Sequence, residues 1–195
     1  MKRLCLLTLL APIAALGGTY DDGVHFLNAK DYSKAARAFH ASAASGNAAA
    51  ERRIGFLYYN GTGVEQDGAA ALAWFERAAE HGDVESQVNL GKMYENGLFA
   101  PQDDAKSAHY FRLAAEQGHR GAQFRLGEIT YLGTGVARDP AEAMKWWLLA
   151  SDPDDDFSKR MNSMLKPTMG KLPTGVVAEG ERRARDWKAN HMSGN

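Results

Sequence analysis

Glycine pairs, histidines and an acidic run are the parts of this sequence whose residue types could support chemistry. Gly61-Thr62-Gly63 and Gly133-Thr134-Gly135 superficially suggest loops that cradle a phosphate. The two loops are copies at a fixed interval, however, and neither matches a Walker-type phosphate loop, so they indicate structural turns between helices. We therefore expect no bound cofactor.

The histidines and acidic residues do not form a recognisable metal site. Two of the six histidines, His81 and His119, fall at nearly equivalent places in turns, while the others are dispersed. A zinc site needs three or four converging ligands, so we expect solvated turn histidines and no metal. The acidic run Asp154-Asp155-Asp156 lacks the Gly and the distal Glu of a calcium loop, and helix N-capping explains it better.

Catalytic motifs are also missing from the sequence. It contains no Gly-x-Ser-x-Gly nucleophile elbow and no His-Glu-x-x-His metalloprotease motif. No pairing of a nucleophile with a base can be recovered from the residue order. We therefore predict no catalytic residues and a protein that is not an enzyme.

A unit of 36 residues, from Ala48 to Asp83, recurs twice more without a gap. Landmarks at the same step are Ile54, Leu90 and Leu126; Gly55, Gly91 and Gly127; Asp67, Asp103 and Asp139; and Trp74-Phe75, Tyr110-Phe111 and Trp146-Trp147. A fixed period of this length is the signature of a solenoid of stacked supersecondary units.

Each unit is predicted to contain two helices. The second half of the first unit has the apolar stripe of an amphipathic helix at Ala71, Trp74, Phe75, Ala78 and Ala79. The first half has a second stripe at Ala50, Ile54, Leu57 and Tyr58. Asp67 is expected to cap one helix, and Gly82 to end it in a left-handed conformation. Gly55 and its equivalents lie mid-helix at a cost of about 1 kcal/mol relative to Ala, which indicates close approach of the paired helix.

These residues resemble a known repeat. The pattern A-x-x-x-(L/I)-G-x-x-Y-x-x-G-x-G-V-x-x-D, followed by A-x-x-W-F-x-x-A-A-x-x-G, is similar to the Sel1-like repeat, a relative of the tetratricopeptide repeat. The resemblance implies an all-α solenoid of helix-turn-helix repeats, a right-handed superhelix that serves as a protein-interaction scaffold without a conserved active site. The unit 84–119 departs from the pattern because Phe99 replaces a glycine. We expect Phe99 either to pack against the neighbouring turn or to contact a partner.

The N-terminus reads as a secretory signal peptide over residues 1–17. A basic start is followed by an apolar run that is too short to span a membrane, and then by small residues suited to cleavage. Cys5, the single cysteine, leaves with this segment, so the mature chain cannot form disulfides. We expect a periplasmic or secreted protein without membrane insertion after cleavage.

Atypical units are expected on both sides of the full repeats 48–83, 84–119 and 120–152. Residues 18–47 read as a degenerate N-terminal repeat that lacks the long loop. Residues 153–195 read as a C-terminal helical cap, with breaks at Pro167 and Pro173. Terminal units differ because their outer faces meet water instead of another repeat.

The charge balance argues against nucleic acid as the partner. The chain has 23 basic and 24 acidic residues, whereas nucleic-acid binding needs a basic excess. A protein partner is expected instead, and the scaffold itself is expected to be a monomer.

One side of each first helix is predicted to bind that partner. On a helical wheel, Arg52, Phe56 and Tyr59 lie opposite the core stripe. By analogy with tetratricopeptide repeats, this side lines the concave surface. Translation by one and two units completes the predicted partner-binding set: Arg52, Phe56, Tyr59, Val88, Lys92, Glu95, Phe124, Glu128 and Tyr131. Aromatic rings interleaved with charges are typical of interface anchors, although the same rings could pack against adjacent repeats.

Two classes of function remain open at this point. The first is a scaffold that regulates or inhibits a protein, either as an immunity protein against a secreted toxic enzyme or as a regulator of an envelope sensor. The second is a hydrolase of cell-wall or β-lactam substrates, as claimed for a disulfide-rich branch of the resembled family. The sequence favours the scaffold, because it lacks both the cysteine pairs of that branch and a nucleophile–base pair.

Overall fold

The computed structural model describes residues 18–152 and 154–192, and within them the chain forms ten α-helices and no strand. The helices are α1 (Tyr20–Asn28), α2 (Tyr32–Ala43), α3 (Ala48–Asn60), α4 (Gly68–Glu80), α5 (Val84–Asn96), α6 (Asp104–Glu116), α7 (Arg120–Leu132), α8 (Pro140–Ala150), α9 (Asp156–Met169) and α10 (Thr174–Met192). The all-α prediction is confirmed. The predicted signal peptide, residues 1–17, lies outside the described residues.

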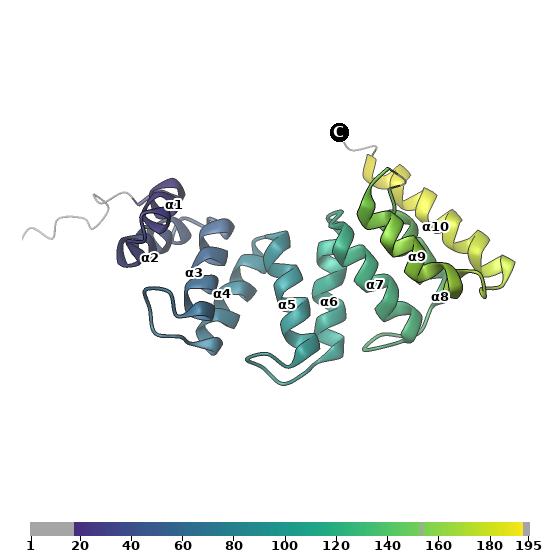
Figure 1. Cartoon of the computed structure of the whole chain (residues 1–195), viewed down its shortest axis with the longest axis horizontal. Helices are drawn as coiled ribbons and strands as arrows, with labels where there is room; N and C mark the ends of the chain where they lie inside the picture. The colour runs from purple at the N-terminus through teal and green to yellow at the C-terminus, as the bar shows by residue number, and fades with distance from the viewer. Residues whose placement is uncertain (1–17, 153, 193–195) are drawn as a thin grey trace, which may run out of the picture.

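The helices form one extended array. From α1 to α8, each helix packs against the next one along the chain, and Figure 1 shows the pairs standing side by side from one end of the molecule to the other. The loops inside the three full units all lie along the lower edge of this view. Successive helices bury a series of apolar clusters along the array, which is the arrangement of a solenoid.

Capping residues set the helix starts at intervals of 36 residues. The first helices of successive units are capped by Asn47, Asp83, His119 and Asp155, and the second helices by Asp31, Asp67, Asp103 and Asp139. Each cap accepts a hydrogen bond from the backbone N–H three residues on, which satisfies an orphan donor of the first turn. Because Asp155 continues the series, α9 begins where a fourth full unit would begin.

The glycines in the middle of the first helices allow the paired aromatic ring to approach closely. A Cβ atom on Gly55 or Gly91 would lie 2.9 Å from Phe75 or Phe111, and one on Gly127 would lie 2.4 Å from Trp147. No real Cβ tolerates such a distance without a shift of its neighbour. The predicted close approach is therefore confirmed.

The core stripes are also where the sequence predicts them. Ile54, Leu90 and Leu126 are fully buried, and Ala71 and Phe75 lie with them beneath the surface. Trp74 differs, because it is only half-buried and packs against His40 with ring centroids 5.3 Å apart. A large indole therefore covers the outside of the stripe instead of filling it.

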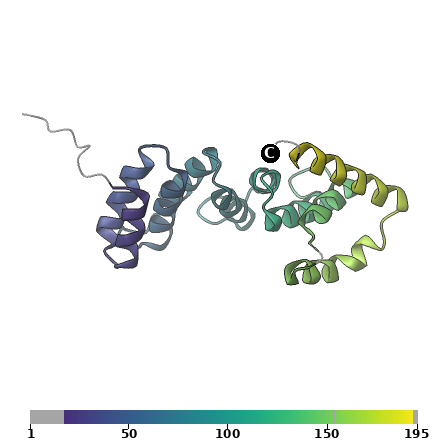
Figure 2. The same cartoon turned by 90° about the horizontal axis from the view of Figure 1, so that it is seen from above.

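The C-terminal segment does not close into a helical pair. Figure 2 shows α9 and α10 diverging at this end of the array. Met161 and Leu165 of α9 share an apolar cluster with Trp147 of α8, whereas α10 packs along α8, where Trp187 meets Trp146 at 6.3 Å. One unit beyond Gly127 and Trp147 the chain has Ser163 and Arg183. The fourth unit therefore lacks both partners of the glycine–aromatic contact.

Arg183 secures α10 to α8 in place of that contact. Its guanidinium Nη1 donates to Asp139 Oδ2 at 2.8 Å and to Glu142 Oε2 at 3.3 Å. The expected break at Pro167 is wrong, because this residue lies in the last turn of α9, which runs on to Met169. Proline has no N–H for the carbonyl of Ser163 four residues earlier, but Ser163 is exposed, so solvent can satisfy that carbonyl.

Candidate protein-interaction face

One side of α3, α5 and α7 carries the residues predicted to bind a partner, and we call it the first-helix face. Equivalent positions on these helices are 36 residues apart. The nine predicted side chains therefore form three rows across the array: Arg52, Val88 and Phe124; Phe56, Lys92 and Glu128; and Tyr59, Glu95 and Tyr131. The structure places these rows differently with respect to solvent.

On α3, all three predicted residues are half-buried. Arg52 forms an ion pair with Asp83, the cap of α5, with 3.1 Å between Nε and Oδ1. The ring of Phe56 meets Phe75 edge-on at a centroid distance of 5.0 Å, and Tyr59 meets Phe99 at 5.4 Å. These rings therefore have a packing role, and only their outer edges are available to a partner.

On α5, the exposure of Val88 was predicted wrongly. This side chain is only 6% exposed and belongs to a core cluster with Ala122 and Leu126, because α7 packs over it. Lys92 is exposed, and its ammonium group forms no ion pair with any described residue. It is the most accessible charge among the nine predicted residues.

Between α5 and α7, two carboxylates share one guanidinium. Arg125 of α7 forms ion pairs with Glu95 of α5 and with Glu128 one turn further along α7. Although partial burial opposes it, these contacts raise the pKa of Arg125 above its ordinary value. The network fixes the two helices relative to each other and leaves a net charge of −1.

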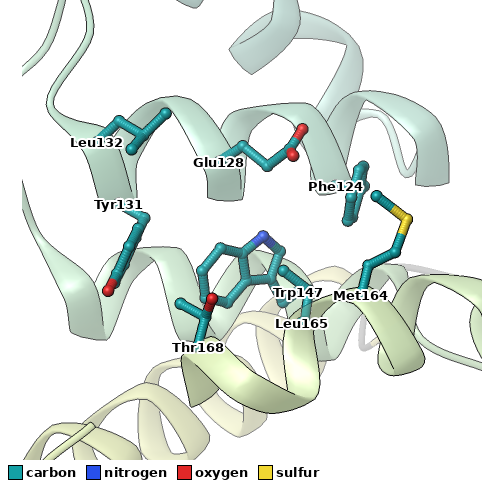
Figure 3. Close-up of a pocket in the computed structure, with 8 residues that line it drawn as sticks. All are labelled: Phe124, Glu128, Tyr131, Leu132, Trp147, Met164, Leu165 and Thr168. Atoms are coloured by element: carbon teal, nitrogen blue, oxygen red, sulfur yellow. The ribbon is translucent and has the colours of Figure 1, made fainter. Parts of the chain in front are cut away.

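Over α7, the first-helix face is partly covered by α9. Phe124 meets Phe157 of α9 with centroids 6.3 Å apart, and Tyr131 meets the buried Trp147 at 5.5 Å. The two helices enclose a cavity of about 220 Å³, which Figure 3 shows with its lining: Phe124, Glu128, Tyr131, Leu132, Trp147, Met164, Leu165 and Thr168. We call it the α7–α9 pocket.

Three residues of this region are missing from the sequence prediction. Arg125 was not assigned to the face, and Leu132 and Met164 are large apolar side chains that are 69% and 67% exposed. The helical wheel considers one helix at a time, so it cannot find a contact that Arg125 makes to a helix 30 residues earlier. The cap series that ends at Asp155 was the one signal in the sequence that α9 lies beside α7.

A second cavity lies at the other end of the face, between α1 and α3. It has a volume of about 320 Å³ and is lined by Leu27, Phe39, Arg53, Phe56, Leu57, Asn60 and Thr62. Arg53 Nε donates to the hydroxyl of Tyr20 at 3.3 Å. Phe56 thus belongs both to the predicted face and to this cavity.

The two turn histidines, His81 and His119, have specific partners that the sequence analysis did not predict. His119 Nδ1 accepts a hydrogen bond from the Ala122 N–H at 3.0 Å, so this ring caps α7. His81 Nδ1 lies 2.7 Å from Oε2 of the buried Glu51. Asp155, from the acidic run, caps α9 as expected. Among the residues that the structure describes, no cluster of three or more potential ligands could hold a metal ion.

The helices between residues 18 and 192, with residue 153 left aside, also lack the properties of a membrane span. None of them combines the length and the apolar character that crossing a bilayer requires.

Comparison with known families identifies the family of the repeat. The model of the Sel1 repeat matches residues 48–83, 84–119 and 121–152, which is more than half of the chain. The chain belongs to the Sel1 repeat family. Sel1 repeat proteins generally mediate protein–protein interaction, and the fold typically serves as a non-enzymatic scaffold.

One solved structure supports this assignment, and a second, more distant one is also similar to this chain. A Sel1 repeat protein from Oxalobacter formigenes is 29% identical with a TM-score of 0.70, over 83% of this chain and 68% of that one. A protective antigen of uropathogenic Escherichia coli, described as displaying an SLR fold, is 22% identical with a TM-score of 0.41. That match covers 86% of this chain and 45% of the antigen. No curated protein sequence matches the chain.

Proposed function

We propose that this protein is an exported, non-catalytic Sel1 scaffold that binds a protein partner through the first-helix face. The supporting observation is a contrast between two sets of positions 36 residues apart. Positions beneath the face repeat their residue type, as in Ile54, Leu90 and Leu126, which are all fully buried. The neighbouring surface positions change from an aromatic ring at Phe56 to a cation at Lys92 and an anion at Glu128.

This contrast suits recognition because folding constrains only the buried set. A solenoid that stacks the same unit can vary its exposed side chains freely, and the variation then encodes which partner fits. Half-buried rings beside charges of both signs supply apolar anchors and a polar rim, as in other protein interfaces. The family membership supports a protein rather than a small ligand as the partner.

Photo-crosslinking in the intact cell envelope tests this proposal. A photoreactive amino acid replaces the exposed Lys92 on the face, and a control protein carries it at Glu116, which is exposed on α6. We expect one dominant crosslinked protein from position 92 and none from position 116. Equal labelling from both positions would contradict the assignment of the face. A second experiment places the photoreactive amino acid at Asn96 and also introduces Lys92→Glu. If this protein gives the same crosslinked product, the assignment is likewise contradicted.

The identity of the crosslinked protein decides between two biological roles. A secreted toxic enzyme that loses activity on binding indicates an immunity protein, whereas the periplasmic domain of a sensor indicates a regulator. Export is tested separately by the intact mass of the protein recovered from the periplasm. We expect a chain that begins near Gly18, and retention of residues 1–17 would exclude the cleaved signal.

A further inference from the structure

The α7–α9 pocket contains a negative charge that is only partly matched. Glu128 is the one charged residue among the eight that line it, and its side chain is 28% exposed. Glu128 shares Arg125 with Glu95, so one guanidinium serves two carboxylates. The residues of α9 that line the other wall, Met164, Leu165 and Thr168, are uncharged.

The preceding contact shows what this charge can bind. Between α5 and α7, Arg125 reaches from the later helix to a carboxylate on the earlier one. One unit further along, the residue equivalent to Arg125 is Met161, which is buried in the apolar cluster under α9. The position equivalent to Glu95 is Tyr131, and the carboxylate that lines the α7–α9 pocket is Glu128, one turn earlier on α7. The later helix supplies no arginine to it.

The remaining lining suits the stem and head of a basic side chain. Figure 3 shows the rings of Phe124 and Tyr131 on either side of Glu128, with Trp147 between them. Aromatic rings attract a cation placed near their faces, and a carboxylate among them adds a charge-assisted hydrogen bond. Leu132 and Met164, both largely exposed, can cover the methylene stem of such a residue.

The size of the cavity favours a single side chain. Pockets for small organic ligands usually enclose about 300–1,000 Å³, which exceeds the 220 Å³ found between α7 and α9. An apolar cavity of about 150 Å³ already holds benzene. The volume is therefore right for one long side chain that enters from a larger partner.

We propose that the α7–α9 pocket receives an arginine or lysine side chain of the protein partner, with its cationic head at Glu128. The inference rests on the proposed function, because it names the group by which a protein partner engages one end of the first-helix face. A partner that binds this way carries an exposed basic residue with apolar neighbours. Binding weakens as salt rises, because the contact is partly exposed.

Peptide binding to the purified protein tests the pocket directly. The probe is the acetylated and amidated pentapeptide Gly-Leu-Arg-Leu-Gly, and the matched probe replaces arginine by citrulline, which has the same shape without the charge. The reporter is the NMR signal of the Trp147 indole N–H, which has no hydrogen-bond partner among the described residues and is assigned with Trp147→Phe. We expect a saturable shift with the arginine peptide and binding about five- to tenfold weaker with the citrulline peptide.

Two variants locate the charge that matters. Glu128→Gln is expected to lower the affinity for the arginine peptide to that for the citrulline peptide. Glu95→Gln removes the other carboxylate of the same network but does not line the pocket, so it should retain binding. Equal affinity for both peptides, no binding of either, or equal losses from both variants would overturn the inference. Crosslinking from position 92 would still stand in each of those cases, so the two proposals can fail separately.

Discussion

Two neighbouring pairs of repeats meet through the same positions but with different residues. At each of these contacts, which we call joints, a loop residue of one repeat lies against the first residue of the second helix of the other. Where 84–119 meets 120–152, the loop residue Gly135 lies against Asp104, the first residue of α6, and a Cβ on Gly135 would come within 2.3 Å of the Asp104 carbonyl carbon. Where 48–83 meets 84–119, the loop residue is Phe99 and the first residue of α4 is Gly68. A Cβ on Gly68 would lie 2.1 Å from Cδ1 of Phe99.

The bulky residue and the glycine have therefore exchanged sides of the joint. The N-terminal joint follows the first arrangement, since a Cβ on Gly63 would lie 2.3 Å from Cβ of Tyr32. Phe99 keeps the left-handed backbone of the glycines it replaces, with φ of 62°, and packs on Tyr59 and Gly68. These contacts support the interpretation that Phe99 fills the joint. An irregular position in one unit is thus matched by a change in the unit before it.

The largest effect is expected from Gly135→Ala. The new methyl group would meet backbone atoms of Asp104, which cannot rotate away, and the residue would keep a φ of 70° that L-residues disfavour. Overpacking and backbone strain together should lower the free energy of unfolding by about 3 kcal/mol. Urea denaturation at equilibrium measures the loss.

Gly82→Ala separates the two causes in that prediction. Gly82 has a φ of 84°, but no heavy atom lies within 4 Å of the place that a methyl group would occupy, so only the backbone strain applies. We expect a loss of about 1 kcal/mol at this control position. If the two alanine variants lose the same stability, the joint at Gly135 is not closely packed and the comparison fails.

The next effect concerns the exchanged joint. Gly68→Asp copies the residue found at the equivalent position 104 and should cost about 2 kcal/mol, because the new side chain meets the ring of Phe99. Phe99→Gly in the same chain removes the obstacle. The double variant should recover most of the stability, since an Asp in the first turn also favours helix formation.

A double-mutant cycle measures this coupling. Contacting residues typically show interaction energies of about 0.5–3 kcal/mol, whereas distant ones add independently. The matched pair Gly68→Asp with Gly175→Ala provides the additive reference, because Gly175 in α10 has no neighbour within 4 Å. Additive losses for Gly68→Asp and Phe99→Gly would show that the exchange across the joint is coincidental.

These joints also explain which parts of the structure the sequence could predict. Residues such as Ile54 and Gly55 repeat at one interval, so they identify the helices and their packing without knowledge of the third dimension. The exchange of Phe99 and Gly68 is different, because its two members lie 31 positions apart and neither repeats. Only the distance between the loop and the preceding unit shows that they meet.

The prediction of the first-helix face failed in part for the same reason, because contacts between units are not visible in the sequence of one helix. The wheel correctly placed Ile54 and Leu57 in the core, and both are buried. It treated Arg52, Val88 and Phe124 as equivalent surface positions, although this row lies at the border between neighbouring first helices. Val88 is covered by α7 and Phe124 is partly covered by α9, so the burial of each depends on the size of the next helix's side chains.

A smaller effect is expected from the helix caps, which also differ between the two joints. Asp83 caps α5 with a carboxylate, whereas His119 caps α7 with an imidazole nitrogen. His119→Asp should raise the free energy of unfolding by about 0.5–1 kcal/mol, because a carboxylate is a better cap and interacts favourably with the helix dipole. Thermal denaturation against His109→Asp, an exposed site inside α6, checks that the gain depends on the cap position.

The smallest effect is expected where the N-terminal joint differs from both later ones. At the later joints, Gln87 and Gln123 donate from Nε2 to the carbonyls of Ala79 and Ala115 at 3.2 and 3.1 Å. The equivalent residue of the first unit is Glu51, which is fully buried and cannot donate. The corresponding carbonyl, that of Ala43, receives a longer bond of 3.4 Å from Arg77 Nη2 instead.

Glu51→Gln should therefore restore the arrangement of the later joints. The amide can donate to Ala43 and still accept from His81 or Arg77, and the change removes a charge whose burial is costly. Arg77 and His81 both lie partly in solvent, with side chains 46% and 43% exposed, so neither becomes a buried unpaired charge. We expect stability to rise by no more than about 1 kcal/mol, with an unchanged urea m-value. Glu80→Gln, the same chemical change at an exposed site of α4, should have no effect. A clear loss of stability in Glu51→Gln alone would mean that the ion pairs of Glu51 outweigh its burial, and that the first joint is held by charge where the later two are held by an amide.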